Sequence, residues 1–147
     1  RPSVSERVIE RNLRRVARLG DGWMTINAVW PPEDFAYMRG RIIEYAKEYG
    51  RDFKSLPAAM YYNININEDQ EAAIEESQKY LEYYYTPQKF ERGSVRGWVA
   101  CGSPEQCVEQ LQGFVDAGAT DITLRFSSWD QKGQFTRCVE EVLPHLV

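Results

Sequence analysis

Apolar residues at the start of the chain first recur every three or four positions and then alternate with polar ones. The first pattern predicts a helix over residues 4–19, and Ser3 with Glu6 forms the S-x-x-E capping box that opens such a helix. The second pattern predicts a strand over 23–29. The apolar positions of the helix are Val4, Val8, Ile9, Leu13, Val16 and Ala17.

This change of period repeats along the chain. Three further strands are expected over 58–66, 97–101 and 122–126. The helices between the strands are expected to begin at Pro31-Pro32, at an Asn67 cap, at Ser103-Pro104 with Gln106 completing a capping box, and near Gly133. Glycines at positions 20, 50 and 118 are expected to end three of the helices, and 86–96 is expected to be the longest irregular connection.

One helix followed by four strand–helix units predicts an α/β fold with a parallel sheet and right-handed crossovers. A complete (β/α)₈ barrel needs eight units and about 250 residues, so four units amount to half a barrel.

Three of the predicted strands, over 23–29, 58–66 and 122–126, each have an apolar face and a more polar one. If the apolar faces pack under helices, the polar faces point into a barrel or cleft, where their carboxyl ends commonly form binding sites. The residues on these polar faces are Thr25, Asn27, Asn63, Asn65, Thr123 and Arg125. We expect them to hydrogen-bond a ligand, with Arg125 pairing with an anionic or carbonyl oxygen; the alternative is a layer of polar side chains bonded to one another. In the final helix, Phe135, Cys138, Val139, Val142, Leu143 and Leu146 are expected to be buried.

The composition restricts the partners of the chain. A net charge of −4 over 147 residues gives no general attraction to nucleic acid or anionic lipid, and no apolar run is long enough to span a membrane. The three cysteines are widely spaced, which indicates neither a disulfide framework nor a metal site and favours the cytoplasm. His145 is the sole histidine and has no plausible triad, so no catalytic residue is assigned.

Two helix starts and one helix face are candidates for binding anions. Backbone N–H groups at a helix N-terminus favour phosphate, so Ser3 with Ser5, and Gly102 with Ser103, are candidates; the alternative is that they only cap their helices. Arginines at positions 7, 11, 14, 15 and 18 form a basic stripe on the first helix. This stripe is either a solvated flank or a surface for an anion or a partner.

Three sequence blocks together resemble one enzyme family. They are R-x-A-R-L-G-D-G-W-M at 15–24, G-S-P-E-Q-C-V-E-Q-L followed by D-A-G-A-T-D-I-T-L-R at 102–125, and V-L-P-H-L at 142–146. In this order and spacing they resemble the C-terminal half of luciferase-like monooxygenases, which are flavin- or deazaflavin-dependent oxidoreductases. The resemblance implies that residues 1–147 are the C-terminal half of a TIM (β/α)₈ barrel, with four parallel strands each followed by a helix.

The resemblance also implies a chemistry for the full-length protein. It implies FMN or the deazaflavin coenzyme F420 at the C-terminal mouth, with hydride transfer or monooxygenation of a small organic substrate. Ser3, Ser5, Asn27, Gly102 and Ser103 then become candidates for cofactor binding, and the substrate side is formed by Asn63, Asn65, Arg125 and Trp30. The chain opens on Arg1-Pro2 without a methionine, so a fragment is expected. The alternatives are a non-catalytic half-barrel that binds a ligand and one that self-assembles; we expect the isolated chain to form a homo-oligomer or to pair with a missing N-terminal half.

Overall fold

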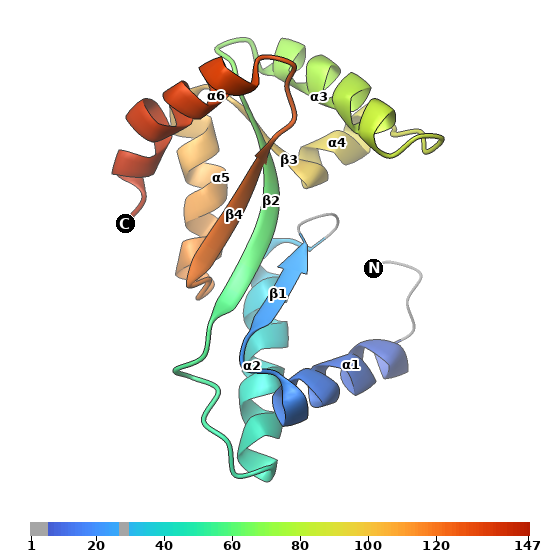
Figure 1. The fold of residues 1–147 in the computed structure, drawn as a ribbon, viewed down its shortest axis with the longest axis vertical. Helices are drawn as coiled ribbons and strands as arrows, with labels where there is room; N and C mark the ends of the chain where they lie inside the picture. The colour runs from blue at the N-terminus through green and yellow to red at the C-terminus, as the bar shows by residue number, and fades with distance from the viewer. Residues whose placement is uncertain (1–5, 27–29) are drawn as a thin grey trace.

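Four parallel strands, each followed by a helix, make up the computed structural model, which describes residues 6–26 and 30–147 (Figure 1). The strands are β1 (Trp23–Ile26), β2 (Ala58–Ile66), β3 (Val99–Gly102) and β4 (Asp121–Phe126). The helices are α1 (Glu6–Leu19), α2 (Pro32–Glu48), α3 (Gln70–Tyr84), α4 (Arg92–Trp98), α5 (Pro104–Asp116) and α6 (Gln131–Arg137), and α6 continues into a π-helical turn (Cys138–Val142) and a 3₁₀ turn (Leu143–His145). The predicted succession of strands and helices is confirmed, except that α4 lies where an irregular connection was predicted.

Strand β2 is the centre of the sheet. Its first half pairs with β1, from Trp23 opposite Ala58 to Ile26 opposite Tyr61. Its second half pairs with β3, whereas β4 pairs along Ala59 to Ile64. Some residues of β2 pair with both β1 and β4, and others pair with both β3 and β4. A residue that pairs with two strands uses both edges of its own strand. Strands β1 and β3 therefore follow each other along one edge of β2, and β4 occupies the other edge. The sheet is therefore not ordered by sequence, because β4 lies beside β2 rather than beside β3.

The main core lies on the face of the sheet that we call the outer face. Met60, Tyr62 and Ile64 of β2 point to this side and pack against α2, α5 and the π-helical turn. The ring of Tyr62 meets Phe114 of α5 edge to face, with the centroids 5.4 Å apart. In the upper part of Figure 1, α5 and α6 lie to the left of β2 and α3 and α4 to its right. The opposite face, which we call the inner face, is thus covered by α3 and α4 only near the carboxyl ends of the strands.

The helix ends obey local rules with two exceptions. Ser103 and Gln106 form the predicted capping box of α5, and Gly50 takes the positive φ of 68° that was expected after α2. The cap of α3 is Asp69 rather than Asn67, whose side chain instead accepts a hydrogen bond from the Asp69 N–H. Gly20 takes no positive φ. The side chain of Arg51 donates to the carbonyls of Ala17 and Gly20, so a distant guanidinium satisfies the end of α1.

The first strand has the opposite phase to the one predicted. Trp23 stacks on Phe35 at 4.9 Å on the outer side, which sets Thr25 on the outer face in register with Met60. Met24 and Ile26 consequently lie on the inner face and are exposed, by 59% and 51%. The prediction that Thr25 points into the barrel is wrong. A strand of only four residues takes its phase from one anchored side chain rather than from its own alternation.

Two predictions about irregular and terminal segments are also corrected. The connection predicted over 86–96 contains the first part of α4, and both Val95 in this helix and Phe90 before it are buried in a cluster with residues of α3. The last helix buries Cys138 and Val142, but it leaves Phe135, Val139 and Leu143 exposed. Their apolar pattern is helical, yet the described part of the chain provides no element to cover them. No helix within the described ranges has both the length and the apolarity that a membrane crossing requires.

Candidate functional site

The inner face brings Asn63 and Arg125 together. These residues are direct partners in the register of β2 and β4, so their side chains project side by side. The Nε–H of Arg125 donates to Asn63 Oδ1 at 2.8 Å, and Asn63 Nδ2 donates to the carbonyl of Trp98 at 2.9 Å. Asn63 is only 3% exposed and is held from both sides. It therefore fixes the orientation of the guanidinium.

Aromatic rings surround the same guanidinium. Arg125 Cζ lies 4.1 Å from the ring centroid of Tyr84 and 5.2 Å from that of Tyr85, and its Nη2 donates to the Tyr85 hydroxyl at 3.3 Å. The Tyr61 centroid is 5.6 Å away. Burial raises the pKa of Tyr61, and this outweighs the lowering by Arg125, so the phenol stays neutral. In the described part of the chain no group accepts a hydrogen bond from Nη1.

A second polar cluster lies further along the inner face. Asn65 is fully buried, and its Nδ2 donates to Glu76 Oε2 at 2.9 Å and to the Ser127 carbonyl at 3.1 Å. Glu76 Oε1 accepts from the Ser128 hydroxyl at 2.8 Å and from the Trp129 N–H at 3.0 Å. Partial burial raises the pKa of Glu76, but these hydrogen bonds outweigh it and hold the pKa below its usual value. The Oδ1 atom of Asn65 is buried without a partner among the described residues.

One small cavity on the inner face is formed by described residues alone. A cavity of about 10 Å³ lies among Ile26, Tyr61, Asn63, Tyr85 and Trp98, which is roughly room for one water molecule. Beyond it, Met24, Ile26 and Tyr84 are exposed. The inner face is therefore one wall of a site, and the described residues contain no opposite wall.

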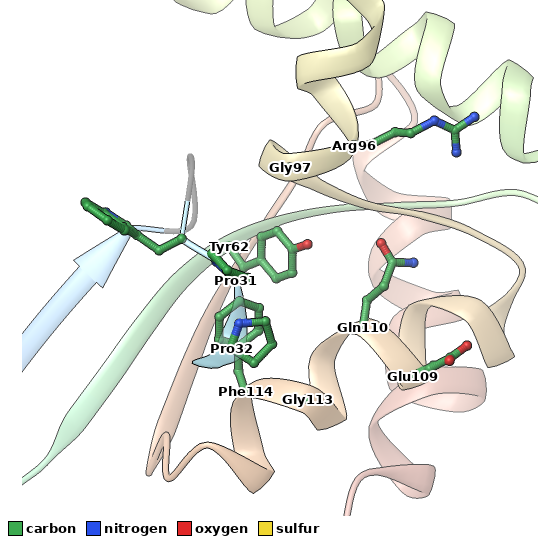
Figure 2. A pocket seen from close by; sticks show the side chains of 10 residues that line it. Pro31, Pro32, Tyr62, Arg96, Gly97, Glu109, Gln110, Gly113 and Phe114 are labelled. Carbon is green, nitrogen blue, oxygen red and sulfur yellow. The ribbon is translucent and has the colours of Figure 1, made fainter. Parts of the chain in front are cut away.

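A larger pocket of about 420 Å³ lies on the outer side of the sheet (Figure 2). Figure 2 shows the Tyr62 hydroxyl and the Gln110 amide directed toward the same space. Gly113 allows Pro32 to approach α5, because an added Cβ would lie 3.1 Å from Pro32 Cγ. The lining residues are Trp30, Pro31, Pro32, Tyr62, Arg96, Gly97, Glu109, Gln110, Gly113 and Phe114. Trp30 thus lies on this pocket and not beside Asn63, Asn65 and Arg125.

The candidate phosphate site at α5 is occupied by its own cap. The Ser103 N–H donates to Gln106 Oε1 at 3.0 Å, and the Ser103 hydroxyl donates to Glu105 Oε2 at 2.7 Å. The Gly102 carbonyl accepts from the Asn67 N–H. An anion at this helix start would have to displace a carboxylate and an amide. The other candidates, Ser3, Ser5 and Asn27, lie outside the described residues.

The cysteines are structural. All three are free and buried, and burial raises the pKa of Cys101 to about 11 and that of Cys107 to about 12, so both stay protonated at neutral pH. Residues 6–26 and 30–147 hold no cluster of three or more histidine, cysteine or acidic side chains that could bind a metal ion.

Sequence reasoning missed Glu76, Tyr84 and Tyr85, which complete the two inner-face clusters. Tyr84 carries the helical period of a buried side chain but is 55% exposed, and Tyr85 follows the end of α3. The only available signal was the tyrosine run at 83–85 near the end of a helix. Because a period does not indicate which face of the sheet a helix covers, that signal could not place them beside Arg125.

The fold and the parallel strands that present polar groups at their carboxyl ends define a half of an α/β barrel. The family model of the luciferase-like monooxygenases matches residues 8–121, and the chain belongs to that family. The chain is 22% identical over 146 residues to an F420-dependent glucose-6-phosphate dehydrogenase of Kribbella flavida, covering 88% of this chain and 44% of that protein.

Solved structures agree on the fold. An F420-dependent secondary alcohol dehydrogenase in complex with an F420–acetone adduct matches with a TM-score of 0.77 and 17% identity, over 94% of this chain and 46% of that one. Riboflavin lyase, solved with modified FMN and riboflavin, matches with a TM-score of 0.62 and 15% identity, over 95% and 40%. The chain thus spans less than half the length of these relatives, and at these identities the likeness shows the fold alone.

Proposed function

We propose that this chain is the C-terminal half of a barrel that uses FMN or coenzyme F420 to oxidise or oxygenate a small organic substrate. Membership of the luciferase-like family supports the redox class, and the relatives above include both F420 and FMN proteins. The single observation that carries the site is Arg125, which Asn63 and Tyr85 hold on the inner face and whose Nη1 has no acceptor among the described residues. We assign Arg125 to the anionic or carbonyl oxygen of the substrate.

The described residues fit one wall of such a cofactor site. A flavin or deazaflavin ring has apolar faces and a polar edge, and the inner face offers exposed Met24 and Ile26 together with the Arg125 donor. The unpartnered Oδ1 of Asn65 is a buried acceptor in the same wall. When bound, the cofactor supplies the redox chemistry, and the residues of this chain orient it and exclude water. The described residues enclose a cavity of about 10 Å³ here, and we propose that a second wall completes the site.

For the phosphate end of the cofactor we favour Ser3 and Ser5. The alternative pair, Gly102 and Ser103, is engaged by the side chains of Gln106 and Glu105. Asn27 directly follows β1 and remains our candidate for the ring edge. Trp30 lines the outer pocket, so we do not assign it to the substrate side beside Arg125.

The second wall is proposed to be the N-terminal half of the same barrel or another copy of this chain. Apolar residues are exposed at both open sides of the half-barrel: Met24 and Ile26 on β1, and Phe135, Val139 and Leu143 after β4. Exposed apolar patches of this kind mark interaction sites, and unpaired strand edges invite pairing. We also assign the chain to the cytoplasm, because its three cysteines are free.

Titration of the purified protein, in its native assembly, with FMN and separately with F420 tests this function. We expect saturable quenching of cofactor fluorescence for one of the two. With the substrate as ligand, Arg125→Gln is expected to weaken binding at least about tenfold, since it removes a charged hydrogen-bond donor. The matched control, Arg92→Gln, removes an arginine that pairs with Glu71 on α3 and is expected to have no effect. Failure to bind either cofactor contradicts the proposal.

A further inference from the structure

Four arginines of α1 line a groove on the surface of the molecule. Together with Tyr49, which follows α2, they surround a volume of about 270 Å³, and we call this feature the arginine groove. Its residues are Arg11, Arg14, Arg15, Arg18 and Tyr49. The proposed oxidoreductase function makes no use of it.

Helical spacing explains how the arginines come together. Positions 11, 14, 15 and 18 are separated by three or four residues and therefore share one face of α1, along about 10 Å of the helix. Leu13 and Ala17 fall on another face and are buried against α2. The packing of α1 on α2 thus fixes the row of arginines beside Tyr49.

The positive charge of the groove is largely uncompensated. Arg14 pairs with Glu48 at 2.8 Å and lies over the Tyr45 ring at 3.7 Å. Arg11, Arg15 and Arg18 are exposed and form no ion pair with any residue in the part of the chain that the structure describes. Like charges three or four residues apart on a helix destabilise it slightly. In a chain of net charge −4, such a concentration of cations calls for a bound anion.

We propose that the arginine groove binds a small anion that carries two or more adjacent phosphate groups. Guanidinium groups bind phosphate oxygens in bidentate pairs, and several of them along about 10 Å match a short chain of phosphates rather than a single one. Tyr49 is 42% exposed, and its ring adds a flat surface at one side of the anion.

Isothermal titration of the full chain with inorganic pyrophosphate at about 150 mM potassium chloride tests the proposal. We expect one saturable site and at least tenfold weaker binding in the double variant Arg15→Gln/Arg18→Gln. The variant Arg15→Lys/Arg18→Lys keeps the charge but loses the planar fork, so its affinity is expected to lie between the two. Because the arginines are exposed, circular dichroism is expected to show unchanged folding in each variant.

The matched control is Lys54→Gln/Lys132→Gln, which removes the same charge from exposed positions outside the groove and is expected to leave the affinity unchanged. Adenosine diphosphate binding more tightly than pyrophosphate would assign the site to nucleotides, whereas equal affinity would assign it to the phosphates alone. Three results would overturn the proposal: no saturable binding of pyrophosphate, equal weakening in the control, or tighter binding of duplex DNA or polyglutamate than of either phosphate compound. Titration of these variants with FMN and F420 distinguishes this proposal from the proposed oxidoreductase function. The groove variants are expected to bind either cofactor as the wild type does.

Discussion

The two faces of the sheet are built on different principles. On the outer face, Met60, Tyr62 and Ile64 of β2 pack into a continuous apolar core with α2 and α5. On the inner face, the alternate residues Tyr61, Asn63 and Asn65 enter hydrogen-bonded clusters or remain next to open surface. Among the described residues, the outer face carries the larger apolar core, and the inner face carries a smaller one under α3 and α4. Stability is therefore concentrated on one side of β2, whereas the chemistry that we propose is concentrated on the other.

Removing volume from the outer core is expected to have the largest effect on stability. Leu111 of α5 is fully buried in that core, so Leu111→Ala is expected to lower the free energy of unfolding by about 2–5 kcal/mol. The inner-face counterpart Met24→Ala, at a side chain that is 59% exposed, is expected to change it by no more than about 0.5 kcal/mol. Urea unfolding of both variants measures the difference. Equal losses would show that the two faces contribute alike.

The buried polar cluster of the inner face is expected to give an intermediate effect. Asn65→Leu removes the donor to Glu76 Oε2 and one of two donors to the Ser127 carbonyl, which keeps the Ser77 hydroxyl, and we expect a loss of about 1–3 kcal/mol. Asn12→Leu, at an exposed position on α1, is the control and is expected to be nearly neutral. A loss below about 0.5 kcal/mol for Asn65→Leu would mean that the cluster does not stabilise the fold.

The pH dependence of the free energy of unfolding tests the contribution of Glu76. Its pKa in the folded protein lies below that of an unfolded glutamate, about 4.3, so the unfolded state binds more protons in mild acid. The contribution of Glu76 is therefore complete above that pKa and is lost as the pH falls through the folded value. The variant Glu76→Gln lacks this pH-dependent contribution. The difference in free energy of unfolding between wild type and variant is therefore expected to become smaller from pH 7 to pH 3.5. A gap that stays constant with pH would refute the assignment.

The smallest change in stability is expected for the exposed side chain of Ile26 on the inner face of β1, together with a change in the oligomeric state. Ile26→Asp alters a side chain that is 51% exposed, so unfolding is expected to shift by about 0.5 kcal/mol or less. Light scattering at micromolar concentration is expected to show an assembly for the wild type and a single chain for the variant. Tyr37→Asp, at a 55% exposed position on α2, is the control and should assemble as the wild type does. A wild-type chain that is already monomeric would contradict the self-association.

Predictions from the sequence succeeded where one short rule was sufficient. The capping box of Ser103 and Gln106 needs only four residues, and the structure contains it. The prediction for Thr25 failed because a four-residue strand has too little alternation to fix its phase against the stacking of Trp23. The burial predicted for Phe135 failed because a helical period describes a face that needs covering and does not supply the element that covers it.

The sequence by itself determined the succession of strands and helices, the family and the apolar face of most elements, because these depend on contacts between near neighbours and on the period of the chain. Only the tertiary structure decided that β4 pairs with β2, that Asn63 and Arg125 form a pair 62 residues apart in sequence, and that Tyr84 and Tyr85 surround the guanidinium. These facts depend on the register between strands and on which face α3 covers. Both are set by packing between distant segments, and no local pattern of residues encodes them.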